Sequence, residues 1–144
     1  MMKLSDFTKS VYEVEFAERN KERGANLGTF NWPIRLESMD GEESLEIEAM
    51  VDTGASYTIV PAHLLKKMGI APIDTISLVL ADGRTVEYEM GEARATICER
   101  SIPTLVVFGA DDARALLGAY TLEGLRLAVD PAHARLVPAT SAWA

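Results

Sequence analysis

Short stretches of alternating polar and apolar residues follow one another along the chain from residue 28 onwards. Residues 44–51 alternate almost strictly, as Ser-Leu-Glu-Ile-Glu-Ala-Met-Val, which is typical of a strand with one buried face. Asp-Gly pairs at residues 40–41 and 82–83 indicate hairpin turns. Stretches of similar length predict further strands at residues 29–36, 76–80, 85–90, 92–97, 102–108, 125–129 and 134–137. The pattern therefore predicts an all-β domain of about eight short strands, arranged as a closed, barrel-like fold.

One or two short helices interrupt this pattern. Residues 61–68 predict a helix, because Pro61 suits its first turn, its apolar residues share one face, and Gly69 is a typical end. A second short helix is expected over residues 111–118, capped by the two aspartates at its start. Residues 122–124 then predict a turn or a helical fragment.

Charge divides the chain into two parts. Residues 1–27 carry equal numbers of basic and acidic residues, so the net charge of −8 belongs to residues 28–144. A loop-like stretch with two glycines, residues 24–28, marks the change. We therefore predict an N-terminal extension over residues 1–27 and a single domain over residues 28–144. The extension fits an amphipathic helix packed on the domain, although residues 11–16 also half-alternate like an edge strand.

The composition excludes several classes of protein. The chain has 144 residues, of which 48% are hydrophobic and 25% charged, and this suits one globular domain. One cysteine excludes a disulfide framework and a multi-cysteine metal site, and two histidines offer little for a zinc centre, so no metal and no cofactor are expected. The negative charge argues against nucleic acid and anionic membranes as partners. No apolar stretch approaches the roughly 20 residues of a spanning helix and no signal-peptide core is present, so a cytoplasmic location is expected.

Three motifs could carry chemistry. Asp52 ends an apolar strand and is followed by Thr53 and Gly54, and the glycine lets a backbone N–H approach and donate to the carboxylate. A plain Asx turn explains the same tripeptide. The second motif, Leu-Leu-Gly at residues 116–118, is explained equally well by the end of a short helix. The third is the hairpin over residues 77–89, which any β-rich chain could contain.

Other chemistry-bearing residues have ordinary explanations. Cys98 lies in an alternating stretch and suits a small core position, and a nucleophilic thiol would need a histidine base. His63 on its short helix and His133 in a turn suit the surface. Asp111 and Asp112 suit a helix cap better than a metal site.

In this order and at these intervals, the three motifs resemble the retropepsin-like aspartic proteases, the single-lobed relatives of pepsin. The resemblance covers residues 28–137 and is nearest to small bacterial and archaeal members. The strings that carry it are Val-Asp-Thr-Gly-Ala at 51–55, Leu-Ala-Asp-Gly at 80–83, Leu-Leu-Gly-Ala at 116–119, Leu-Glu-Gly-Leu at 122–125 and Val-Asp-Pro at 129–131. The resemblance implies a single acid-protease lobe, a closed β-barrel-like domain with one or two short helices that is active as a two-fold homodimer.

The resemblance also implies a role for each matching residue. Asp52 would be the catalytic carboxylate, Thr53 would send its hydroxyl across the subunit interface, and Gly54 would support the carboxylate. Ala55 would line the substrate cleft. The apolar segment behind the catalytic strand would consist of Leu116, Leu117 and Gly118, and the flap that closes over the substrate would carry Ala81, Asp82, Gly83 and Arg84 at its tip.

Peptide hydrolysis of this kind needs two carboxyl groups, one ionised to activate water and one protonated to donate to the carbonyl oxygen of the scissile bond. Two carboxyls about 3 Å apart share one proton and titrate together. The chain has a single Asp-Thr-Gly and too few residues for a second lobe. The predicted function is therefore an aspartic-type endopeptidase for peptides or unfolded proteins, with Asp52 of two subunits meeting at a two-fold axis. The alternative is a protease-like fold with little or no hydrolysis that binds peptides or mediates dimerisation.

Overall fold

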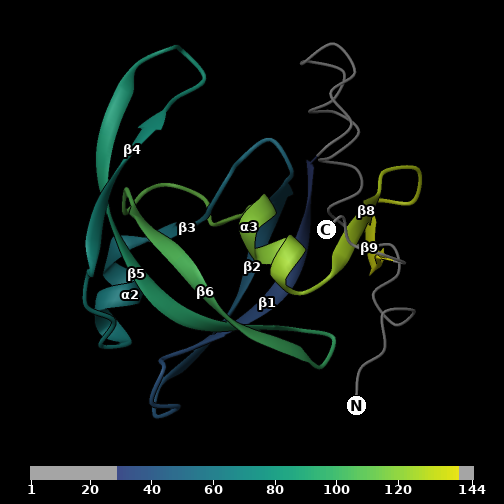
Figure 1. Cartoon of the computed structure of the whole chain (residues 1–144), viewed down its shortest axis with the longest axis horizontal. Coiled ribbons are helices and arrows are strands. Elements are labelled where there is room, and N and C mark those ends of the chain that lie inside the picture. Colours follow the sequence, from purple (N-terminus) through teal and green to yellow (C-terminus); the bar gives the residue numbers. More distant parts are fainter. Residues whose placement is uncertain (1–28, 140–144) are drawn as a thin grey trace.

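The computed structural model describes residues 29–139, which form nine strands and two short helices (Figure 1). The predicted extension over residues 1–27 lies outside the described residues. In chain order the elements are β1 (Thr29–Glu37), β2 (Ser44–Asp52), β3 (Thr58–Pro61), α2 (Ala62–Lys67), β4 (Asp74–Val79), β5 (Thr85–Ile97), β6 (Arg100–Gly109), β7 (Leu116–Leu117), α3 (Ala119–Gly124), β8 (Leu127–Asp130) and β9 (Arg135–Pro138).

Strands β1 to β7 form one sheet in the order β1-β2-β7-β3-β6-β5-β4. A further antiparallel pairing between β1 and β5 closes this sheet into a barrel, and β4 lies beside β5 outside the closure. Neighbouring strands are antiparallel except for the parallel pairs β2–β7 and β3–β6. Strands β8 and β9 form a separate antiparallel hairpin. The predicted mainly-β, barrel-like fold with two short helices is confirmed.

The alternating pattern decides which side chains fill the barrel. On β1, Trp32, Ile34 and Leu36 are buried and lie opposite apolar residues of β2 in an unbroken register. Burial of each large apolar side chain contributes roughly 1.5–3 kcal/mol to folding. The other large apolar side chains that are at most 2% exposed are Phe30, Val51, Val60, Leu65, Ile97, Val106, Val107, Leu117, Leu125 and Leu136.

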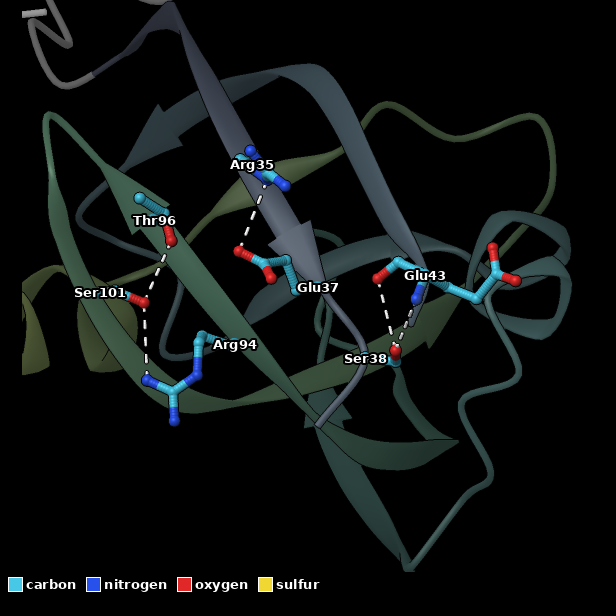
Figure 2. A network of polar contacts seen from close by, with 7 residues as sticks. All are labelled: Arg35, Glu37, Ser38, Glu43, Arg94, Thr96 and Ser101. Atoms are coloured by element: carbon cyan, nitrogen blue, oxygen red, sulfur yellow. Dashed lines mark hydrogen bonds and ion pairs between the residues drawn. The ribbon is translucent and has the colours of Figure 1, made fainter. Parts of the chain in front are cut away.

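Polar side chains cover the outside of the seam where β1 meets β5 (Figure 2). Arg35 lies opposite Thr96, and its Nε is 3.5 Å from Oε1 of Glu37. Ser101 on β6 accepts a hydrogen bond of 3.1 Å from the Thr96 hydroxyl and a longer one of 3.5 Å from Arg94 Nη1. The closure of the barrel is therefore solvated on its outer face and apolar inside.

The first predicted Asp-Gly turn is confirmed between β1 and β2. Gly41 has φ +77°, a left-handed conformation that glycine adopts without strain. Ser38 organises the turn, because its hydroxyl donates to Asp40 Oδ1 at 2.6 Å. The same hydroxyl accepts the Glu43 N–H at 3.0 Å (Figure 2). The Ser38 hydroxyl and the Glu42 N–H hold the pKa of Asp40 below its usual value.

The helix predicted over residues 61–68 is confirmed as α2. Pro61 precedes its first residue, Leu65 and Met68 are buried, and Gly69 follows with φ +76°. Among the described residues, neither helix is long and apolar enough to cross a membrane.

The break predicted between residues 85–90 and 92–97 is wrong, because both stretches belong to the single strand β5. Gly91 lies in the middle of this strand and faces the barrel interior. A Cβ there would be 3.0 Å from the Ala71 carbonyl oxygen and 3.2 Å from the Phe108 ring. The glycine therefore allows neighbouring segments to pack closely against β5, and it does not form a turn.

The helix predicted over residues 111–118 is also wrong, because Leu116 and Leu117 form strand β7 and the helix begins only after Gly118. The Met50 N–H donates to the Ala115 carbonyl at 2.8 Å, which draws this segment into the sheet. Asp111 does accept a helical N–H, but it belongs to His63 in α2. The final hairpin is confirmed as β8 and β9.

Cys98 does not occupy the predicted position within a core strand. It lies in the turn between β5 and β6, where Cys98 and Glu99 have φ of 49° and 71°, and its side chain is half-buried. A two-residue hairpin turn of this kind takes positive φ at both positions. His63 and His133 are exposed, as predicted.

Candidate active site

Asp52 is the last residue of β2 and begins a tight loop that leads to β3. Its side chain is half-buried, whereas Thr53 and Gly54 are exposed. The Gly54 N–H donates to Asp52 Oδ1 at 2.9 Å, and the Ala55 N–H donates to the Asp52 carbonyl at 3.1 Å. A Cβ at Gly54 would lie 3.2 Å from the same Oδ1. The backbone donation to the carboxylate that the sequence predicts is present.

The segment that begins with β7 lies directly behind this loop. Strand β7 is inserted between β2 and β3, with Leu116 and Leu117 parallel to Met50 and Val51. Leu117 is fully buried and Leu116 half-buried. The Leu-Leu-Gly segment therefore begins as a strand of the same sheet, directly beside the strand that ends at Asp52.

Gly118 and the start of α3 hold the loop by its backbone. The N–H groups of Ala119 and Tyr120 donate to the carbonyls of Ala55 and Ser56 at 2.8 and 2.9 Å. Gly118 packs on Tyr57 so closely that a Cβ would lie 2.4 Å from its carbonyl oxygen. Residues 55–57 are consequently fixed against the α3 segment.

A chain of three buried threonine hydroxyls lies beneath these contacts. The Oγ1 atoms of Thr58 and Thr121 are 2.7 Å apart, and those of Thr104 and Thr121 are 2.8 Å apart. Thr58 Oγ1 also accepts the Gly118 N–H at 3.2 Å. All three threonines are at most 3% exposed, so these hydrogen-bonded hydroxyls join β3, β6 and α3 away from water. The sequence did not point to this chain, because single threonines in distant segments give no local signal.

The hairpin of β4 and β5 carries the third predicted motif. Leu80 and Arg84 close its turn by a 2.7 Å backbone hydrogen bond, and Gly83 has φ +87°. Asp82 accepts the Arg84 backbone N–H at 3.0 Å and the Arg84 Nε at 2.6 Å, and these two bonds hold the pKa of Asp82 below its usual value. All residues of the tip, with Ala81, are exposed.

In Figure 1 this hairpin rises from the barrel at the end of the molecule where the β2–β3 loop lies. Of the three predicted motifs, the structure brings two into direct contact, the Asp52 loop and residues 116–118. The hairpin tip, residues 81–84, lies apart from them at the far end of β4 and β5.

One face of the hairpin continues the interior of the barrel. Register along β5 is unbroken, so Glu87 and Glu89 lie on the same side of the strand as the buried Ala93 and Ala95. Val79 belongs to the same face and is 74% exposed. This face of the hairpin is therefore polar, acidic and open.

A metal centre has no counterpart in the part of the chain that the structure describes. No group of three or more histidine, cysteine, aspartate or glutamate side chains is placed to hold an ion within residues 29–139. Asp111 instead binds the backbone N–H and the ring of His63, and these contacts lower the pKa of its carboxyl.

Residues 38–124, more than half of the chain, match the family described as "gag-polyprotein putative aspartyl protease". No match was found among curated proteins.

The chain is similar to many solved structures, among them the following three. One is the solution structure of the Simian Foamy Virus (mac) protease, with 20% sequence identity and a TM-score of 0.45, where the match covers 65% of this chain and 94% of that chain. Another is the EIAV protease complexed with the inhibitor HBY-793, with 19% identity and a TM-score of 0.46, where the match covers 66% of this chain and 86% of that chain. The third is a retropepsin-like aspartic protease from Rickettsia conorii, with 19% identity and a TM-score of 0.44, where the match covers 74% of this chain and 89% of that chain.

The family match spans the carboxylate loop, the hairpin and the Leu-Leu-Gly segment together, and the chain therefore belongs to the gag-type aspartyl protease family.

Proposed function

We propose that the chain is an aspartic endopeptidase whose active site forms when two copies bring their Asp52 side chains together. The observation that carries the proposal is the carboxylate of Asp52, held by the Gly54 N–H on a backbone-braced loop, in a chain of the aspartyl protease family. The substrate class is peptides or unfolded segments of proteins. No cofactor takes part.

The reaction needs each of the two carboxyl groups in a different protonation state. One ionised Asp52 removes a proton from water, and the protonated partner donates to the carbonyl oxygen of the scissile peptide. Two carboxyls in contact cannot both ionise, so they share one proton and titrate as a pair. The chain supplies only one Asp-Thr-Gly, and the second carboxyl must come from a second copy in an isologous dimer.

The other predicted residues have supporting roles in this proposal. Thr53, exposed beside Asp52, links the two loops across the interface, and Ala55 lines the cleft. Leu116, Leu117 and Gly118 support the loop from behind, and residues 81–84 form the tip of a flap over the substrate. Residues 28–144 constitute the protease domain and residues 1–27 an extension to it.

Activity per subunit should depend on protein concentration. Below the dissociation constant of the dimer, the fraction of dimer rises with concentration, so the cleavage rate per subunit should rise and then level off. The measurement is a dilution series with a pool of unstructured peptides between pH 4 and 8, alongside sedimentation of the same samples. A constant rate per subunit across the monomer–dimer transition would contradict the shared active site. Absence of cleavage by a folded dimer at every pH would favour the peptide-binding alternative.

Substrate charge should affect the rate. Glu87 and Glu89 lie on the face of the hairpin that continues the barrel interior, and in this proposal that face borders the bound peptide. Peptides with Lys or Arg near the cut should therefore be cleaved roughly 1.4- to fivefold faster than Glu counterparts, as expected for exposed charge pairs of about 0.2–1 kcal/mol. The double variant Glu87→Gln with Glu89→Gln should remove this preference. Glu92→Gln is the matched control, since Glu92 is exposed on the opposite face of β5. An equal loss of preference in both variants would mean that net charge alone is responsible.

A further inference from the structure

Thr29, the first residue of β1, has a buried hydroxyl without a hydrogen-bond partner. The residue is 1% exposed, and its Oγ1 neither donates to nor accepts from any other residue that the structure describes. Buried polar atoms are nearly always paired, and an unpaired one calls for a structural or functional reason. No role for this residue follows from the motifs in the sequence.

The register places Thr29 directly across from Asp52. The two residues are partners at the end of the antiparallel β1–β2 pair, so their side chains stand on the same face of the sheet. Directly opposed residues of an antiparallel pair have Cβ atoms about 4.5–5.5 Å apart, which is within reach of a hydroxyl and a carboxylate.

Asp52 has an oxygen available for this hydroxyl. Its Oδ1 accepts the Gly54 N–H, and no hydrogen bond from the described residues reaches Oδ2. A donor without an acceptor and an acceptor without a donor therefore lie opposite each other on neighbouring strands.

We propose that Thr29 is a positioning residue whose hydroxyl, after rotation about χ1, donates to Oδ2 of Asp52 and favours the ionised carboxylate of the dyad. The inference rests on the proposed function. A hydrogen bond to the charged form of a carboxyl stabilises that form, so the hydroxyl would extend activity toward lower pH. It would also restrain the carboxylate plane, because Gly54 and Thr29 would then hold its two oxygens from two different segments.

No titratable side chain is paired with Asp52 in the register of the described strands, because its partner on β1 is Thr29. The strand that flanks β2 on its other side, β7, consists of two leucines and has none. The paired face of β1 and β2 carries charges only further along the strands. The titratable side chains on the elements that adjoin the Asp52 loop are Arg35 and Glu37 on β1, Glu46 and Glu48 on β2, Asp111, Asp112 and Arg114 before β7, Tyr57 and Tyr120 beside the loop, and Glu123 on α3. Asp82 and Arg84 lie further away, at the hairpin tip (Figure 1).

The test compares Thr29→Val, which keeps the shape and removes the hydroxyl, with Thr29→Ser, which restores the donor. In the pH profile of kcat/KM, Thr29→Val should move the acidic limb to higher pH by about half to one unit and leave the basic limb unchanged, and Thr29→Ser should return it toward the wild type. Thr96→Val is the control, because the Thr96 hydroxyl lies on the outer face of β5 and donates to Ser101 of β6. An unchanged acidic limb in a folded Thr29→Val dimer would overturn the proposal.

A second readout separates this inference from the proposed function. The carboxyl-carbon NMR signal of Asp52 can be followed against pH in the wild-type and Thr29→Val proteins. The midpoint of its pH dependence should lie at higher pH in Thr29→Val than in the wild type, whether or not the protein cleaves peptides. Displacement without cleavage would support the hydrogen bond and contradict the peptidase. Coincident titration curves would overturn the role of Thr29 even in an active enzyme.

Discussion

Asp52→Asn should lower kcat/KM for peptide cleavage by about a thousandfold or more, as expected when the group that activates the nucleophile is lost. The amide oxygen of asparagine can still accept the Gly54 N–H, so the loop and the fold should be retained. The amide cannot carry the negative charge that activates water or exchange a proton with its partner. Cleavage of the same peptides by wild-type and variant protein, with thermal unfolding of both, provides the measurement.

Asp82→Asn is the matched control for this experiment. Asp82 also precedes a glycine in a tight turn, but it is exposed at the hairpin tip and bound to Arg84. Its substitution should leave at least a tenth of the activity, because an exposed ion pair contributes roughly 0.2–1 kcal/mol. Cuts that persist in Asp52→Asn would point to a contaminating protease or to another mechanism, and the role proposed for Asp52 would be wrong.

Mixed dimers extend the same prediction. When wild-type and Asp52→Asn subunits exchange freely, a dyad with one asparagine lacks either the base or the acid. Addition of variant subunits at constant wild-type concentration should therefore suppress activity as heterodimers form. Activity that stays proportional to the wild-type subunits would argue against a shared site.

The carboxylate loop could be predicted from the sequence because its signals are local. The alternation of residues 44–51 sets the strand, Asp52 falls at its end, and Gly54 permits the close backbone donor. The hairpin turns at Gly41 and Gly83 follow from the same kind of local signal, and both glycines have positive φ.

The support behind the loop could not be predicted in the same way. Two leucines before a glycine fit the end of a helix and a short strand equally well, and periodicity cannot distinguish them over so few residues. The segment forms a strand because it pairs with residues far away in the sequence, where the Met50 N–H donates to the Ala115 carbonyl. The threonine chain likewise joins Thr58 to Thr121 across 63 positions, and only the folded topology brings them together.

Gly118→Ala should be the most damaging single methyl group that can be added near the site. The added Cβ would lie 2.4 Å from the Tyr57 carbonyl oxygen and 2.5 Å from its carbonyl carbon, distances that only a shift of backbone can relieve. Gly118 itself has φ −96°, which alanine adopts without strain. Any loss of stability would therefore come from the steric clash with Tyr57 and not from backbone strain at residue 118. Overpacking of this kind costs typically 1–3 kcal/mol, and more where backbone must move.

The displaced backbone belongs to the loop that carries Asp52, so activity should fall further than stability explains. We expect at least a hundredfold loss in kcat/KM at a temperature where the variant is folded, measured together with denaturant unfolding. Gly124→Ala is the matched control: its Cβ would also lie 2.4 Å from a neighbour, but that neighbour is the terminal Cδ1 of Ile102, which can rotate away. Equal damage from both substitutions would mean that crowding anywhere around α3 disrupts the protein. Damage confined to Gly118 would show that the Leu-Leu-Gly segment acts on catalysis through the backbone of Tyr57.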